Sequence, residues 1–298
     1  MINNLKHKLL YSKKVAPYIF ILPFILSFSV FYFYPLLSSI NMSFQKVLPG
    51  DVTYVGLDNY QRLFNSADFF TSIWVTAKFT FWTIVVLIPL PLILAVFLNT
   101  KNLPGRNLFR SSLFIPILTS TIVGGIIFRF IFAESESSIA NSIISIFGFE
   151  PLKWRFTPNT GMFMMVLLAS WRWMGVNLLY FLAGLQNIPK DLYESADIDG
   201  ASAFAKFRFI TIPMLKPVII YVLTISIYGG FKMFEESYVY WQSALPGNIG
   251  LTLFRYLYLK AFQEFNLGYG AAISMMILLM VIAINFIQLY LTGAFKKN

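Results

Sequence analysis

The sequence predicts an all-α protein that crosses a membrane six times, with both chain ends in the cytoplasm. Of its 298 residues, 57% are hydrophobic and 12% are charged, against a charged share of about 25% in soluble domains. Six apolar runs are each long enough to cross a bilayer as a helix, and basic residues gather in alternate loops. This composition excludes an ordinary soluble enzyme and a disordered chain.

The six expected spans are continuous apolar runs, without the alternating polarity of membrane-barrel strands. Their approximate bounds are residues 16–40, 74–98, 111–132, 161–185, 214–236 and 271–292. The first run is too long for a signal peptide and no small-residue cleavage pattern follows it, so we expect it to remain as a helix. The expected organisation is a cytoplasmic tail at 1–15, one transmembrane domain at 16–292 and a cytoplasmic tail at 293–298.

Basic residues orient the spans. One set of loops and tails carries 13 lysines and arginines, and the alternate set carries six. The positive-inside rule places the richer set in the cytoplasm, and an even number of spans also puts both ends on one side. The richer set consists of Lys6, Lys8, Lys13, Lys14, Lys101, Arg106, Arg110, Lys190, Lys206, Arg208, Lys216, Lys296 and Lys297.

The three loops on the other side, at 41–73, 133–160 and 237–270, are each long enough to hold a short helix. Residues 138–147 have helical apolar spacing. We therefore expect a surface helix there, lying flat at the outer membrane interface.

Several chemistries have no residues to support them. The chain has no cysteine and one histidine, His7, so a thiol nucleophile, a disulfide or a His/Cys metal site is not expected. It has no phosphate-binding loop, because Gly-Lys occurs nowhere, and we expect no ATP hydrolysis in this chain. The net charge of +10 is explained by cytoplasmic loops, without a nucleic-acid partner.

The cytoplasmic segment 187–213 predicts a helix, a turn and a second helix. Pro189 suits a helix start, and Asp191 and Glu194 place negative charge near the helix N-terminus. Gly200 permits a sharp turn. Residues 201–210 form the second helix, which Pro213 ends.

This segment has the character of a docking surface. Glu194 offers a carboxylate to a basic group, and the small Ala196 beside it allows a partner to come close. An amphipathic connector on lipid headgroups is the alternative. Headgroup-bound helices favour basic polar faces, whereas the first helix has four acids and one lysine, which favours a protein partner.

The spacing of this segment resembles the EAA loop of ABC-importer permease subunits. That family pattern is E-A-A, three residues, G, nine residues, then I-x-L-P. Ser195 and Ile212 replace an Ala and a Leu of the pattern, and the spacing is unchanged. The sequences at 56–60, 99–110 and 181–189 extend the resemblance to the maltose-type carbohydrate branch, whereas 243–247 departs from the branch's glycine-rich turn.

The resemblance implies a multi-pass permease of the bacterial inner or plasma membrane, working by alternating access. It implies a second permease subunit, a cytoplasmic ABC ATPase dimer that binds ATP and Mg, and an extracytoplasmic solute-binding protein that delivers a carbohydrate, expected to be an oligosaccharide. The residues expected to couple this chain to the ATPase are Glu194, Ser195, Ala196, Asp199, Gly200, Ile210 and Pro213.

Polar and aromatic residues within the spans are candidates for a sugar path, because polar groups there are costly. Those candidates are Trp171, Arg172, Trp173, Asn177 and Tyr228. Packing or interface roles are the alternative for the tryptophans. Helical spacing lets Lys232 pair with Glu235 or Glu236, as a structural ion pair or an outer gate.

Two other functional classes remain as alternatives. An ion-gradient-driven secondary transporter or channel would require more buried carboxylates or internal repeats than the sequence offers. An intramembrane enzyme would require a catalytic constellation that the spans do not offer. Within the importer class, a sugar phosphate is an alternative solute, although Arg172 is the one basic residue well inside a span.

Overall fold

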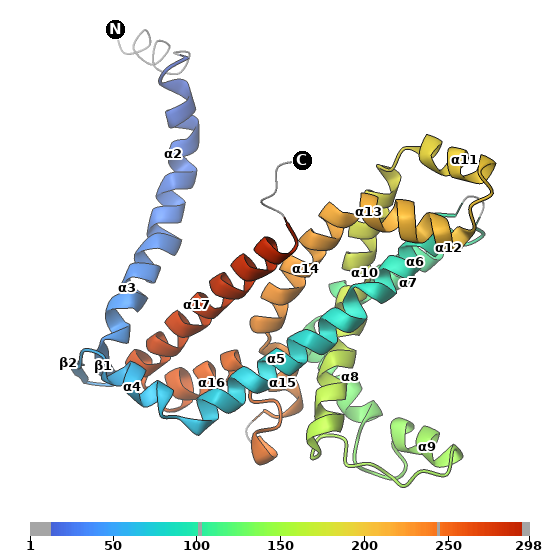
Figure 1. Cartoon of the computed structure of the whole chain (residues 1–298). Helices are drawn as coiled ribbons and strands as arrows, with labels where there is room; N and C mark the ends of the chain where they lie inside the picture. Colours follow the sequence, from blue (N-terminus) through green and yellow to red (C-terminus); the bar gives the residue numbers. More distant parts are fainter. Residues whose placement is uncertain (1–12, 101–102, 243–244, 294–298) are drawn as a thin grey trace, which may run out of the picture. The chain divides into compact units, whose positions relative to one another are not determined.

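The structure is a computed structural model that describes residues 13–100, 103–242 and 245–293. The described chain is mainly helical (Figure 1). It divides into two compact units. One is Met1–Asn65 with Leu259–Met276, and the other is Ser66–Tyr258 with Ile277–Asn298. The two expected tails fall almost wholly outside the described residues, as does Lys101.

Within the described residues, four helices are long and apolar enough to cross a membrane, or up to six spans if two bent helix pairs each count as one. The four correspond to the first, second, fourth and sixth expected spans. They are Ala16–Ser43, Ala67–Leu98, Pro158–Gln186 and Leu267–Leu291.

The third and fifth expected spans were each predicted as one continuous helix, and this is wrong. Helices α7 (Arg106–Leu118) and α8 (Thr121–Ile131) are bent by 101°, because the two residues between them have extended backbone. Helix α14 (Lys216–Phe231) is bent by 67° from the preceding helical segment, and the chain leaves the helix again after Phe231. An apolar run fixes the length of a span but carries no information about a change of direction.

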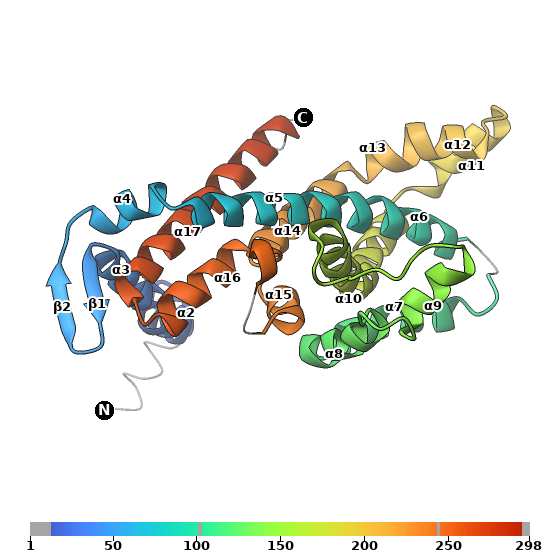
Figure 2. The ribbon, with the colours of Figure 1, turned by 90° about the horizontal axis from the view of Figure 1, so that it is seen from below.

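The first unit contains a β-hairpin that an all-α prediction missed. Strands β1 and β2 pair antiparallel with Val47 opposite Val52, and Figure 2 shows them side by side. The amide of Asn59, in the helix that follows the hairpin, donates hydrogen bonds of 2.9 Å to the carbonyls of Ser43 and Gln45, which ties that helix to the start of the hairpin. The elements are α2 (Ala16–Phe28), η1 (Ser29–Phe33), α3 (Tyr34–Ser43), β1 (Gln45–Leu48), β2 (Asp51–Tyr54), α4 (Asp58–Phe64), η4 (Leu259–Gln263) and the start of α17 (Leu267–Leu291).

The second unit is built around α10 (Pro158–Gln186). Met164 and Leu168 belong to one buried cluster and Leu178 and Phe181 to another. Gly175 lets α7 cross α10 closely, since a Cβ there would lie 2.1 Å from the carbonyl oxygen of Leu113. The other elements are α5 (Ala67–Leu87), α6 (Pro89–Leu98), α9 (Ile139–Ile146), α11 (Lys190–Ile198), α12 (Ala203–Lys206), η2 (Phe207–Thr211), α13 (Ile212–Met214), α15 (Glu235–Tyr240), η3 (Pro246–Asn248) and α16 (Leu253–Tyr258).

Helix α9 confirms the short helix expected at 138–147. Ser138 caps it by accepting a hydrogen bond from the Asn141 amide. Ile139, Ile143 and Ile146 are exposed along it. Its position at a membrane interface stays a prediction.

A buried hydrogen bond from α10 stabilises the break between α5 and α6. Pro91 has no N–H to bond the carbonyl of Leu87, four residues earlier. The side-chain amide of Asn177 donates to that carbonyl at 2.8 Å instead. Because an unpaired carbonyl in apolar surroundings is costly, we assign Asn177 a structural role.

We predict that Asn177→Ala lowers the stability of the purified protein by about 1–3 kcal/mol, the usual cost of an orphaned buried polar group. Thermal unfolding in detergent measures the effect. Asn285→Ala is the matched control, because the Asn285 amide bonds the carbonyl of Val281 in its own helix. Equal melting temperatures for the two variants would contradict the role of Asn177.

Candidate functional site

In the coupling segment, defined as residues 187–213, the first helix and the turn fold as the sequence predicts. Helix α11 begins directly after Pro189 and ends in a Schellman motif at Gly200, whose φ is +72°. The amide of Ala201 donates to the carbonyl of Ala196 at 2.9 Å, and that of Gly200 donates to Asp197 at 3.1 Å. Such a turn favours glycine because other side chains are strained at positive φ.

The second helix of the segment differs in its bounds from the prediction. It begins at Ala203, after Ser202 accepts a hydrogen bond from the Ala205 amide at 3.2 Å. It continues past Pro213 to Met214, so Pro213 does not end it. The direction changes at Leu215, one residue before α14 begins.

The segment is fixed to the helices that it joins. The hydroxyls of Tyr193 and Thr211 lie 2.8 Å apart and join its two helices. Tyr193, Phe207 and Ile210 pack against the buried cluster that contains Leu178 and Phe181. Ile210, expected as a coupling residue, therefore faces this core.

The opposite side of the segment is open. Glu194, Ser195, Asp199, Gly200 and Pro213 are exposed, and Ala196 is half-buried. Figure 1 shows α11 and α12 at one end of the second unit and α9 at the other.

Sequence reasoning missed an apolar surface on this segment. Ile198, Phe204 and Phe209 expose 87%, 74% and 75% of their surface. Large apolar side chains exposed together favour contact with another protein or a membrane. Their signal in the sequence is aromatic and aliphatic residues between the charges of a cytoplasmic loop.

A second group of polar side chains, the charged cluster, consists of Thr121, Arg172, Glu235 and Glu236. An Arg172 guanidinium nitrogen lies 3.6 Å from a Glu236 carboxylate oxygen and 3.8 Å from one of Glu235. The side chains of Arg172 and Glu236 are 12% and 8% exposed, whereas that of Glu235 is 62% exposed. The Thr121 hydroxyl donates to Glu235. The cluster thus joins α8, α10 and α15.

The expected pairing of Lys232 with the glutamates is corrected. Helix α14 ends at Phe231 and α15 begins at Glu235. Lys232 and the two glutamates therefore do not lie on one helix. Arg172 pairs with the glutamates instead, and the Lys232 ammonium lies 5.9 Å from the centre of the Tyr228 ring.

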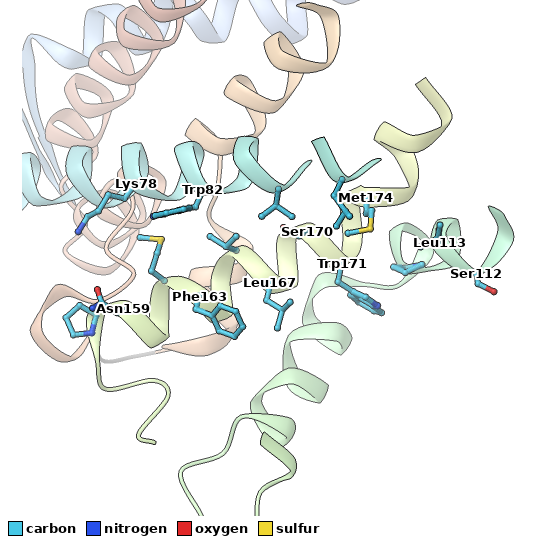
Figure 3. Close-up of a pocket in the computed structure, with 16 residues that line it drawn as sticks. Lys78, Trp82, Ser112, Leu113, Asn159, Phe163, Leu167, Ser170, Trp171 and Met174 are labelled. Carbon is cyan, nitrogen blue, oxygen red and sulfur yellow. The ribbon is translucent and has the colours of Figure 1, made fainter. Parts of the chain in front are cut away.

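The other sugar-path candidates separate into open and packed side chains. Trp173 and Tyr228 are exposed. Trp171 packs on Phe128, with ring centres 5.5 Å apart, and lines a cavity beside α10 (Figure 3). Asn177 is buried against Leu87.

The loop between α8 and α10 is held by two polar groups that the sequence did not reveal. The fully buried Asn141 accepts hydrogen bonds from the Leu152 amide at 3.0 Å and the Trp154 indole at 2.8 Å. Arg155 donates two hydrogen bonds to Glu134, at 2.6 and 2.7 Å. These bonds from Arg155 hold the pKa of Glu134 below its usual value, although burial acts in the opposite direction.

Among the described residues, no group of three or more His, Cys, Asp or Glu side chains is arranged to hold a metal ion.

Comparison with known proteins identifies the family. A family model described as the binding-protein-dependent transport system inner membrane component matches residues 88–297. The chain belongs to this family. The matched range includes the whole coupling segment. The resemblance to ABC-importer permeases is therefore confirmed.

Relatives cover nearly the whole chain. The chain is 60% identical to the arabinooligosaccharides transport system permease protein AraP of Bacillus subtilis, over 97% of this chain and 92% of AraP. It is 34% identical to the lactose transport system permease protein LacF of Rhizobium radiobacter, over 93% of each. It is also similar in fold to a chain of a bacterial ABC transporter that imports alginate, with a TM-score of 0.85, 20% identity and 99% coverage of both chains.

We predict that Arg172→Gln destabilises the protein by about 3–5 kcal/mol, because it leaves the buried Glu236 carboxylate without a countercharge. The double variant Arg172→Gln with Glu236→Gln recovers much of this loss. A double-mutant cycle on melting temperature measures the coupling. Additive effects would mean that the two side chains do not interact.

The Arg155–Glu134 pair predicts a pH dependence. A lowered carboxyl pKa in the folded state stabilises the protein above the unfolded pKa of about 4.3. The contribution is lost as pH falls through the lower folded value. For a partly exposed pair we expect about 1 kcal/mol at neutral pH.

Melting temperatures of the parent and Glu134→Gln test this expectation. The difference between them should be present at pH 7 and shrink below pH 4. Glu136→Gln, at an exposed acid of the same loop, should resemble the parent throughout. A difference that persists at the lowest pH would show that the Glu134 charge is not responsible.

Proposed function

We propose that this chain is the permease subunit of an ABC importer for oligosaccharides and forms half of the path through the membrane. The observation that carries this proposal is the coupling segment, whose two helices are packed onto the spans while its acidic face stays open. The likeness to AraP, at 60% identity, supports an oligosaccharide as the solute. Family membership supports import with a separate binding protein.

The driving force comes from a partner in this proposal. A cytoplasmic ATPase dimer binds ATP and Mg, and the coupling segment of this chain docks on it. Glu194 pairs with a basic group of the ATPase, the small Ala196 permits close approach, and the Gly200 turn sets the angle between the two helices. Closure of the dimer then moves the spans as rigid bodies.

Two further partners complete the transporter. A second permease subunit forms the other half of the path, and an extracytoplasmic binding protein delivers the solute. The bias of basic residues supports six spans with both ends in the cytoplasm of a bacterial inner or plasma membrane. In that orientation the loop held by Asn141 faces outward, and its hydrogen bonds give the binding protein a rigid surface.

The exposed Trp173 and Tyr228 are the candidates to contact sugar, because aromatic rings offer flat apolar faces to a polyhydroxylated ligand. Trp171 and Asn177 have supporting roles beside the path. Trp171 packs on Phe128, and Asn177 bonds the Leu87 carbonyl. The charged cluster lies where α8 and α15 begin. In this proposal the charged cluster is a gate whose ion pairs open during transport. Lys232 lies three residues before Glu235, in the break between α14 and α15.

We predict that Glu194→Arg separates the ATPase from the permease and abolishes ATP-dependent oligosaccharide uptake. The reason is charge reversal at a docked surface, which leaves the partner's basic group facing an arginine. The measurement is the amount of ATPase that co-purifies with the chain from native membranes, together with uptake in the same cells.

The matched control is Glu150→Arg, which makes the same charge change at an exposed acid of the loop between α8 and α10. It should retain the ATPase. If no ATPase co-purifies with the parent chain or with Glu194→Arg, and uptake follows an ion gradient instead, the importer proposal is wrong.

A further inference from the structure

The second unit contains a cavity of about 730 Å³, and none of its described lining residues belongs to the coupling segment or to the charged cluster. Residues of α5, α6, α7 and α10 line it (Figure 3). Its wall is mainly hydrocarbon, aromatic ring and thioether, including Trp82, Phe163 and Leu167. A sugar would find few hydrogen-bonding partners on such a wall, whereas an acyl chain requires none.

Among the described lining residues, the single charged group lies at one end of the cavity. Figure 3 shows Lys78 and Asn159 at that end, Ser170 near the middle, and Ser112 beside Leu113 towards the other end. Because the two serine hydroxyls are neutral and the rest of the wall is mainly apolar, a ligand that matches this cavity has a charged head and a largely apolar tail.

The position of Lys78 along its span matches the level of lipid headgroups. A helix needs about 20 residues to cross the hydrocarbon core. Counting back that number from Leu98, the end of the second span, places Lys78 at the edge of the core. Trp74 and Trp82 lie one helical turn to either side and are exposed. Tryptophan and lysine together are typical of a membrane interface.

Lys78 lacks a countercharge within the described parts of the chain. The ion pairs found there involve other residues. Its ammonium contacts the Trp74 ring, 5.2 Å from the ring centre. A half-buried ammonium beside an apolar cavity is satisfied best by an anion, and a phosphate offers charge-assisted hydrogen bonds.

We propose that the cavity binds an anionic phospholipid of the outer leaflet, with its phosphate at Lys78 and one acyl chain between α5 and α10. This site rests on the membrane orientation given in the proposed function. An apolar helix of another subunit would also fill the cavity, but it would leave the Lys78 charge unpaired at the hydrocarbon edge.

The test is native mass spectrometry of the assembled transporter in mild detergent, titrated with phosphatidylglycerol or with phosphatidylcholine. The parent should retain phosphatidylglycerol preferentially. Lys78→Gln should weaken phosphatidylglycerol binding about fivefold, as expected for one basic group at a lipid surface, with little effect on phosphatidylcholine. Leu167→Trp, which fills the cavity, should weaken both.

Lys153→Gln is the matched control, because it removes an exposed lysine of the loop before α10 that does not line the cavity. It should bind both lipids like the parent. Equal phosphatidylglycerol binding by the parent and Lys78→Gln overturns the site.

A helix of another subunit in the cavity would also overturn the site. Because the chain has no cysteine, Leu113→Cys can be tested for crosslinking to single cysteines of the second permease, and efficient crosslinking would identify such a helix. Oligosaccharide uptake by the same preparations in vesicles reports separately on the proposed function, so failure of one does not imply failure of the other.

Discussion

Polar side chains of α10 partner groups at two breaks in the neighbouring helices of the second unit. Asn177 bonds the Leu87 carbonyl that Pro91 leaves without an N–H. Arg172 pairs with Glu235 and Glu236, where the chain restarts as α15. In lipid, backbone groups find no water, so non-helical backbone persists only where protein satisfies it. At the break between α5 and α6, Asn177 of α10 provides that satisfaction.

The first helix and the turn of the coupling segment could be predicted because their determinants are local. Gly200 sets the turn, Pro189 precedes the first helix, and acids gather in a short stretch. The apolar runs likewise predicted where helices occur. The features that could not be predicted from the sequence depend on tertiary contacts. The pairing of Glu236 with Arg172 joins residues 64 positions apart in sequence, whereas Lys232 lay closer along the chain and fitted a helix that the structure interrupts.

The hairpin at 45–54 and the Asn141 hydrogen bonds were missed for a related reason. Val47 and Val52 form a pair only because the chain reverses between them, in a segment too short to give a strong alternating pattern. A buried asparagine is indistinguishable in sequence from an exposed one. Its burial follows from Leu152 and Trp154 folding back on it. Likewise the exposure of Phe204 and Phe209 became visible only when the packed side of the coupling segment was known.

The geometry of α10 links the two sites that the proposed function uses. Its last residues enter the cluster that packs Tyr193 and Ile210 of the coupling segment, and Arg172 lies 14 residues before its end at Gln186, about 21 Å along the axis. A continuous, well-packed helix transmits displacement with little loss. Movement of α11 by a docked partner therefore displaces Arg172 against Glu235 and Glu236, unless α15 moves by the same amount. A non-helical break separates α15 from α14, and the Tyr240 hydroxyl of α15 also donates to the Met164 carbonyl of α10 at 3.2 Å. The ion pairs of the charged cluster are then the contacts that must be kept or exchanged when the transport path switches between its inward-open and outward-open states.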